Sequence, residues 1–199
     1  LIVILILSCD SKKQNLKLPS IFSDHMVLQQ KTDVIFWGKS NPNDKIVITG
    51  SWGDSNHVKS DNYGNWELRL STPSAGGPYE LEVSSSENTI KYQDVLIGEV
   101  WLASGQSNMV WKLNQCEGCI KDQKEEIENA NYNQIRFFNN PMDLSGTVIK
   151  SQKWRAVTPE SAGEMEDAFS IESFSATGYF FARELYNELS VPIGIISSS

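Results

Sequence analysis

Short strand-like runs separated by turn-forming residues fill the sequence between residues 18 and 97. In one of them Trp66, Leu68 and Leu70 alternate with Glu67 and Arg69, which is the period of a strand with one buried face. The runs recur about every ten residues, as they do in antiparallel sandwiches, and no helical pattern interrupts them. The sequence therefore predicts an antiparallel β-sandwich domain over residues 18–97, with strands at 34–37, 45–49, 66–70 and 79–83.

The pattern changes at residue 98, where strand-like and helix-like segments begin to alternate. Apolar strands are predicted at 99–103, 135–138 and 193–197, and helices at 122–131 and 176–190. Strands that alternate with helices are typical of a parallel sheet. Residues 98–199 are therefore predicted to begin an α/β domain, and this domain is incomplete because about 100 residues hold only three strands.

The helix predicted at 176–190 is indicated by an apolar repeat at the helical period and by a serine before its first turn. Phe181, Leu185 and Leu189 recur at the helical period, which predicts that these three side chains form its buried face. Ser173 or Ser175 is expected to cap its first turn, because a serine oxygen can accept a hydrogen bond from a free amide there.

Charge and composition exclude several classes of protein. The chain has 199 residues with 17 Lys and Arg against 25 Asp and Glu, a net charge of −8, which argues against nucleic-acid binding. A composition with 40% hydrophobic and 21% charged residues is that of a globular protein. Only two histidines are present, which severely limits metal and acid–base chemistry. Three cysteines are too few for a disulfide scaffold.

The first nine residues resemble a bacterial lipoprotein signal. Seven aliphatic residues, too few to span a bilayer, precede Ser8 and Cys9. In such a signal the cysteine is lipidated and becomes the mature N-terminus. We therefore expect residues 1–9 to be the signal, residues 10–17 to be a linker, and the protein to be exported as a periplasmic or cell-surface lipoprotein of a bacterium. A buried strand is the other interpretation of the aliphatic run.

The most reactive candidate is Ser107, which follows the strand predicted at 99–103. Gly105 permits a tight turn, and the residues after Ser107 can begin a helix whose amides face an oxyanion. An exposed hydroxyl beside backbone donors is the arrangement that acyl transfer needs. Taken alone, Gly-x-Ser is a weak signal, since an ordinary turn with a capping residue has the same composition.

Further motifs, in a fixed order over residues 18–197, make the signal specific. The stretch 98–109 (GEVWLASGQSNM) resembles the nucleophile block of the sialate O-acetylesterases, which belong to the SGNH hydrolase superfamily. Similar matches occur at 18–29 (LPSIFSDHMVLQ), 37–38 (WG), 75–79 (AGGPY), 94–99 (DVLIGE), 174–185 (FSATGYFFAREL) and 191–196 (VPIGII).

This resemblance implies a fold and a function. The fold is a β-sandwich domain at 18–97 followed by an α/β/α SGNH hydrolase domain, of which 98–199 is the N-terminal part only. The reaction is removal of O-acetyl groups from sialic acids or related glycans, with no metal or organic cofactor. Ser107 is then the nucleophile and its own amide contributes to the oxyanion hole. Gln106 stands where many SGNH enzymes have Asp, and Asn108 braces the turn together with Gly105.

A base for Ser107 is missing from the sequence. In the superfamily an Asp-x-x-His block far towards the C-terminus supplies it, whereas here His25 and His57 both precede the serine and match no such block. We expect both histidines to be structural or surface residues, with His57 in a polar turn. The chain is accordingly expected to be an inactive N-terminal part of a longer esterase. The alternative is a non-catalytic, lipid-anchored glycan-binding module or an inactive remnant.

Two further features stay open. Cys116 and Cys119 form a lone C-x-x-C, which fits a local disulfide in an exported protein or two incidental thiols, whereas structural zinc needs four ligands.

Several tryptophans can stack on sugars. Trp66 and Trp101 fit buried strand positions, and Trp111, four residues after Ser107, is the one we expect near a substrate.

Overall fold

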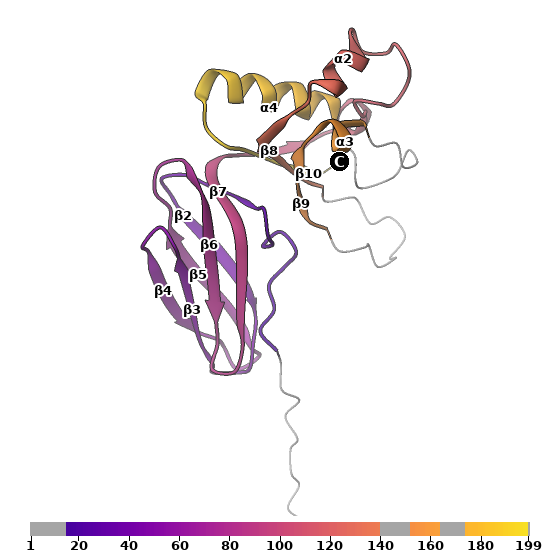
Figure 1. The fold of residues 1–199 in the computed structure, drawn as a ribbon. Helices are drawn as coiled ribbons and strands as arrows, with labels where there is room; N and C mark the ends of the chain where they lie inside the picture. Colours follow the sequence, from indigo (N-terminus) through magenta and orange to yellow (C-terminus); the bar gives the residue numbers. More distant parts are fainter. Residues whose placement is uncertain (1–14, 140–151, 164–173, 199) are drawn as a thin grey trace, which may run out of the picture.

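The computed structural model describes residues 15–139, 152–163 and 174–198, and the chain forms a mixed, sheet-dominated fold (Figure 1). One sheet has eight strands in the order β4-β3-β6-β7-β10-β8-β9, with β1 paired to β7, and a second sheet has β2 and β5. The strands are β1 (Val27–Gln29), β2 (Asp33–Lys39), β3 (Lys45–Gly50), β4 (Ser55–Lys59), β5 (Asn65–Ser71), β6 (Gly76–Ser84), β7 (Thr89–Ser104), β8 (Tyr132–Asn139), β9 (Trp154–Val157) and β10 (Ile193–Ser198). The helices are α1 (Ser107–Val110), α2 (Gln123–Glu128), α3 (Pro159–Gly163) and α4 (Ala176–Leu189).

Every strand and helix predicted from the sequence has a counterpart in the structure; β6 and β7 are longer than predicted, whereas the helix predicted at 122–131 is shorter and covers only Gln123–Glu128. The strand expected at 79–83 is β6, which begins three residues earlier, at Gly76. The expectation for His57 is wrong: it lies in β4, where it pairs with Val47 of β3, and not in a turn. The β4 run alternates weakly and carries only one aliphatic residue, Val58, so its sequence pattern does not distinguish it from a loop.

Strand β7 joins the two halves of the molecule. Its first part pairs antiparallel with β6 and parallel with β1, and its last six residues pair parallel with β10. β8 also runs parallel to β10, while β9 is antiparallel to β8. The predicted division between residues 97 and 98 falls inside this strand, and the assignment of two domains stays a prediction.

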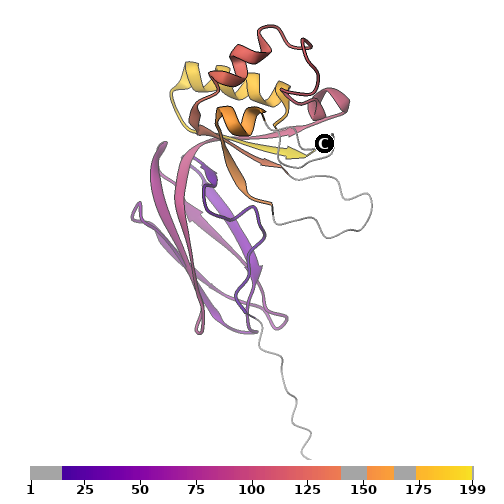
Figure 2. The same cartoon turned by 45° about the vertical axis from the view of Figure 1, so that its right-hand side comes forward.

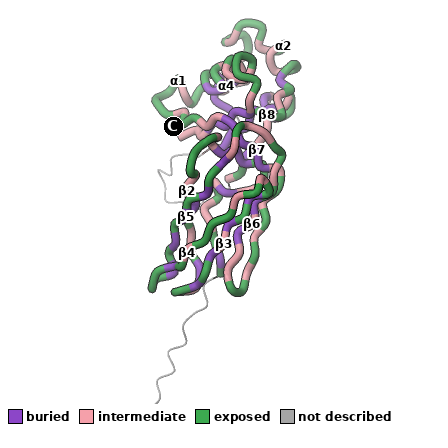
Figure 3. The backbone as a smooth tube through the Cα atoms, turned by 90° about the vertical axis from the view of Figure 1, so that its left-hand side faces the viewer, coloured by how far each residue is buried: buried purple, intermediate pink, exposed green. Residues whose placement is uncertain are grey.

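The N-terminal sheets, built from β1 to β6 and the first part of β7, share one apolar core. Within β5, Trp66, Leu68 and Leu70 are buried while Glu67 and Arg69 are exposed, which confirms the predicted alternation (Figure 3). These side chains pack in one cluster with Ile46, Leu81, Val95 and other residues of the larger sheet. Burial of apolar surface between the two sheets is therefore the main force that holds this half together.

The C-terminal sheet, formed by the end of β7 with β10, β8 and β9, carries the helices on the side away from the N-terminal sheets (Figures 1 and 2). Ser175 caps α4, because its Oγ accepts a hydrogen bond from the amide of Gly178 at 3.1 Å. The other expected cap, Ser173, lies outside the described residues. Nowhere in residues 15–139, 152–163 and 174–198 is a helix long and apolar enough to cross a membrane.

The predicted buried face of α4 is wrong. Tyr179 and Ala182 are buried against the sheet, whereas Phe181 is 43% exposed and Leu189 is 49% exposed. Leu185 is only partly buried. The small side chain of Ala182 lets the helix approach the sheet closely, and the helix is rotated so that Phe181 packs edge-on against Trp101 at 5.2 Å instead. Helical period alone does not distinguish these two faces.

Candidate functional site

Ser107 is the first residue of α1, three residues after the end of β7. Gly105 makes the turn with a φ of +156°, a conformation that L side chains rarely adopt. A Cβ built on it would have ordinary contact, 3.6 Å from the Cβ of Met109. The backbone angle therefore explains the glycine, and crowding does not.

The turn lies at the carboxyl edge of the parallel strands. Ser198 of β10 pairs with Ser104 of β7, and Ser197 pairs with Asn139 at the end of β8. Three strands thus end side by side where Ser107 begins its helix, and Ser107 itself is exposed. Open α/β sheets bind their ligands at this edge.

The start of α4 holds α1 in place. The Ala176 amide donates to the Trp111 carbonyl at 2.7 Å, and the Thr177 hydroxyl donates to the Asn108 carbonyl at 3.2 Å. The Ser175 hydroxyl lies 3.4 Å from Met109 Sδ. The residues that follow Ser107 are therefore fixed by a helix more than 60 positions later in the sequence.

The structure brings the predicted site residues together in one turn. The Gln106 carbonyl accepts a hydrogen bond from the Met109 amide at 2.8 Å, and the Ser107 carbonyl accepts one from the Trp111 amide at 3.1 Å. Asn108 follows directly, and Trp111 ends the short helix with 44% of its surface exposed. The catalytic, turn-support and substrate-binding roles of these residues stay predictions.

Neither histidine of the chain lies beside Ser107. His25 Nδ1 lies 2.7 Å from Asp94 Oδ2, and Asp94 is ten residues before Ser104 in the same strand. Ten residues of extended chain span about 33 Å. His57 lies further away in the sequence, on β4. A general base must come within hydrogen-bond reach of the hydroxyl, so neither histidine serves Ser107 in this arrangement.

His25 belongs to an ionic cluster that the sequence did not reveal. Partial burial acts to raise the pKa of Asp94, but the hydrogen bonds and the charges of His25 and Arg136 together outweigh it and hold that pKa below its usual value. Arg136 Nη1 also donates to the His25 carbonyl at 2.8 Å. The cluster joins β8 to the N-terminal sheets and is structural.

The structure also answers the expectations for the two cysteines and for two of the tryptophans. Cys116 and Cys119 form a disulfide, which decides between the two interpretations left open. No group of three His, Cys, Asp or Glu side chains that could hold a metal occurs among the described residues. Trp66 is buried as predicted, whereas Trp101 is 44% exposed. The expectation for Trp101 is wrong: among the described residues this part of β7 pairs with β10 alone and is an edge, and the Trp101 ring packs edge-on against Phe181, which is itself only partly buried.

Comparison with known proteins places these features in a family context. The chain matches no protein-family model. A sialate O-acetylesterase from Mus musculus is 28% identical over 215 residues, and one from Homo sapiens is 30% identical over 196 residues. These matches take in 100% and 90% of this chain. The resemblance to the sialate O-acetylesterases is confirmed.

A solved structure agrees with these sialate O-acetylesterase relatives. A carbohydrate acetylesterase from Xanthomonas citri superposes with a TM-score of 0.79 at 38% identity over 92% of this chain. The present chain spans 38% of the mouse sialate O-acetylesterase, 36% of the human one and 40% of the Xanthomonas protein. The similarity therefore concerns a little more than a third of each of these proteins.

Proposed function

We propose that this chain is the N-terminal part of a serine carbohydrate esterase that removes O-acetyl groups from sialic acids or related glycans. The observation that carries the proposal is the position of Ser107, exposed at the carboxyl edge of parallel strands β7, β10 and β8. The names of the sialate O-acetylesterase relatives and of the Xanthomonas carbohydrate acetylesterase support the same reaction class.

In the proposed reaction the Ser107 Oγ attacks the acetyl carbonyl carbon and loses its proton to a base. The bond between that carbon and the sugar oxygen then breaks, the sugar leaves as an alcohol after taking up the proton, and the acetyl group stays on Ser107 as an ester. Water attacks this ester and releases acetate. The amide of Ser107 stabilises the oxyanion, Gly105, Gln106 and Asn108 support the turn, and Trp111 contacts the sugar.

The base belongs, in this proposal, to a part of the protein outside these 199 residues. The support is that the two histidines of the chain are remote from Ser107 and that the chain spans 38% of the mouse relative. The corresponding architecture is a β-sandwich domain over 18–97 followed by the first part of an SGNH hydrolase domain. The isolated 199-residue chain should then show negligible turnover.

We also propose that the protein is exported and held at a bacterial membrane by a lipid on Cys9. The support is the aliphatic run that precedes Cys9 in the sequence. Cys9 and the rest of residues 1–14 lie outside the described residues. Mass spectrometry of the mature N-terminus after expression in a bacterial host tests this proposal, because a mature protein that retains residues 1–8 contradicts it.

The test of the function uses the protein with its natural downstream sequence and an activated acetate ester. Ser107→Ala should reduce kcat/KM at least about 10³-fold, as loss of a serine nucleophile does. Ser104→Ala is the matched control, since Ser104 is an exposed serine three residues earlier. A serine-directed fluorophosphonate should label Ser107 and spare Ser104. Equal activity of Ser107→Ala and the unmutated protein would exclude the assignment.

A further inference from the structure

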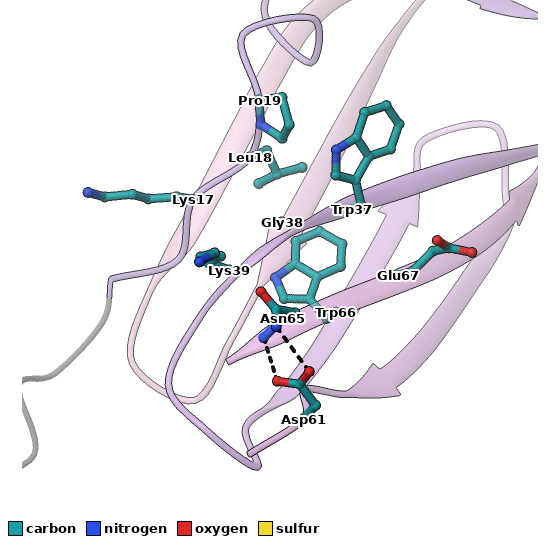
Figure 4. Close-up of a pocket in the computed structure, with 10 residues that line it drawn as sticks. All are labelled: Lys17, Leu18, Pro19, Trp37, Gly38, Lys39, Asp61, Asn65, Trp66 and Glu67. Atoms are coloured by element: carbon teal, nitrogen blue, oxygen red, sulfur yellow. Dashed lines mark hydrogen bonds between the residues drawn. The ribbon is translucent and has the colours of Figure 1, made fainter. Parts of the chain in front are cut away.

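A groove on the N-terminal sheets, far from Ser107, has the composition of a ligand site. It lies where the described chain begins, and it is lined by the segment 17–19 with residues of β2 and β5 (Figure 4). Ser107 lies in the other half of the molecule, beyond the end of β7 (Figure 3). The groove is lined by Lys17, Leu18, Pro19, Trp37, Gly38, Lys39, Asp61, Asn65, Trp66 and Glu67.

Trp37 provides the groove with a fixed aromatic surface. It is 43% exposed, although it lies in the middle of β2. The buried Phe22 ring packs edge-on against it, with 4.8 Å between ring centroids and 78° between planes, so the indole is held in one orientation. Trp66 lines the groove from the buried face of β5: it pairs with Gly38, and a Cβ on that glycine would lie 2.8 Å from its ring. An aromatic face that is rigid before binding loses little entropy when a ligand stacks on it.

Two lysines are neighbours along the backbone beside this aromatic surface, and the Lys17 side chain extends away from Trp37 (Figure 4). Lys17 and Lys39 exchange both backbone hydrogen bonds, at 2.8 and 2.9 Å. In such a pair the Cα atoms are about 5.5 Å apart and the side chains leave the backbone on the same side. Like charges directly opposite each other are unfavourable. Among the residues that the structure describes, no acidic side chain forms an ion pair with either lysine.

The strand register arranges the polar groups around Trp37. Lys39 is two residues from Trp37, on the same face of β2 and about 7 Å away. Asn65 of β5 pairs with Lys39, and Glu67 of β5 pairs with Trp37. Asn65 Nδ2 donates to Asp61 Oδ2 at 3.0 Å, which fixes its amide. Three adjacent segments, residues 17–19, β2 and β5, thus contribute a cationic pair, an indole, an amide and a carboxylate.

We propose that this groove is a binding site for a pyranose that carries a carboxylate, such as a hexuronate or a sialate residue of a glycan. The sugar ring stacks on Trp37, its carboxylate lies between Lys17 and Lys39, and its hydroxyls bond to Glu67 and Asn65. Amphipathic rings suit an indole face, and lysine ammonium groups suit a carboxylate. The chain as a whole carries a net charge of −8, so the lysine pair selects a small anionic group and not a long polyanion.

The same fold contains a matched control. Lys45 of β3 and Lys59 of β4 form another cross-strand lysine pair. Their neighbouring pair on the same face is Val47 with His57, with no tryptophan. If paired lysines alone attracted the ligand, both pairs would contribute to binding, whereas the proposed site needs Trp37 as well.

The test measures binding and not hydrolysis, with sugars that carry no acetyl ester, so its outcome is independent of Ser107. Titration calorimetry compares trigalacturonate with its neutral methyl ester, and sialyllactose with lactose. The expected result is tighter binding of at least one acidic sugar than of its neutral partner, with a shift of the Trp37 indole resonance in NMR spectra. Equal binding within each pair, or no binding of either acidic sugar, overturns the proposal.

Variants locate the site. Trp37→Ala should weaken binding of the acidic sugar about tenfold, because the sugar ring loses the indole face on which it packs. Lys39→Gln should weaken it about threefold and remove the preference for the acidic sugar, while Lys59→Gln should leave Kd within about twofold. If Trp37→Ala does not fold, Trp37→Phe and the Lys17→Gln/Lys39→Gln double variant replace it. Unchanged affinity in these variants, or an equal loss in Lys59→Gln, overturns the assignment.

Discussion

Arg136 of β8 donates two hydrogen bonds to the carboxylate of Asp94 in β7, both 2.9 Å long, across 42 positions of sequence. The Arg136 side chain is 6% exposed and that of Asp94 is 38% exposed. The guanidinium also donates to the carbonyls of Asp94 and His25, at 2.6 and 2.8 Å. A buried cation therefore has its charge and most of its donors satisfied by the N-terminal half of the molecule.

Asp94→Asn should lower the free energy of unfolding by about 2–3 kcal/mol, because it leaves a buried guanidinium without its anion. Asparagine is the appropriate replacement, since Asp94 has a φ of +52° and asparagine tolerates this conformation. Denaturation in guanidinium chloride measures the effect. Glu82→Gln is the control: its ion pair with Lys91 is exposed and should contribute less than about 1 kcal/mol. Equal losses in the two variants would contradict the prediction.

The same carboxylate should make stability depend on acidity. The pKa of Asp94 is lower in the folded protein than the ordinary value of 3.8, so its ionised form favours folding. This contribution is complete above the unfolded-state pKa and is lost as the pH falls through the folded-state value. The unfolding free energy should therefore decrease more steeply from about pH 5 to 3 in the unmutated chain than in Asp94→Asn. Parallel pH profiles would show that Asp94 is not responsible.

Gly98→Ala should destabilise the chain by about 3 kcal/mol, because β7 and the residue before β10 approach too closely for a side chain. A Cβ at this position would lie 2.7 Å from the carbonyl carbon of Pro192, which is backbone and cannot rotate away. At Gly163 the nearest atom is a methyl carbon of Ile127 at 3.1 Å, which can shift. Thermal unfolding of both alanine variants should show the larger decrease in Tm for Gly98→Ala. A smaller decrease than for Gly163→Ala would count against the backbone clash.

Leu102→Ala should change the free energy of unfolding by less than about 0.5 kcal/mol, although Leu102 lies in an apolar strand. Its side chain is 69% exposed. Ile97→Ala, five residues earlier in the same strand, should cost about 2–5 kcal/mol, because Ile97 is fully buried. Denaturant titration of the isolated 199-residue chain distinguishes the two. A cost above 1.5 kcal/mol for Leu102→Ala would show that this end of β7 is covered in solution.

Local pattern was sufficient for most of the described strands and for α2 and α4, but it was insufficient for β4, β9 and α3 and for the faces that the elements bury. The alternation in β5 and the serine before α4 are signals within a few residues, and both predictions are confirmed. The face of α4 depends on what packs beneath it, and Ala182 gives no strong apolar signal although it is fully buried. The exposure of Trp101 depends equally on which strands are its neighbours.

In the candidate site and the clusters around it, local features were predictable from the sequence and contacts between distant segments were not. The turn at Ser107 is encoded by Gly105 and its neighbours, so the sequence predicts it. The ion pair between Arg136 and Asp94 and the juxtaposition of Lys17 with Lys39 depend on strand pairing between distant segments. Neither residue of such a pair is unusual in its own stretch of sequence, so no local pattern predicts the contact.

Because β7 is one continuous strand, its pairing with the N-terminal sheets sets the position of Ser107 at its other end. In an extended strand each residue advances the chain by about 3.3 Å and turns the next side chain to the opposite face. A one-residue insertion between Asp94 and Gly98 would thus move the turn at Gly105 relative to β10 and reverse the face on which every later side chain of β7 lies. Contacts remote from the turn, such as the pairing of β1 with residues 96–98, thereby determine where Ser107 lies.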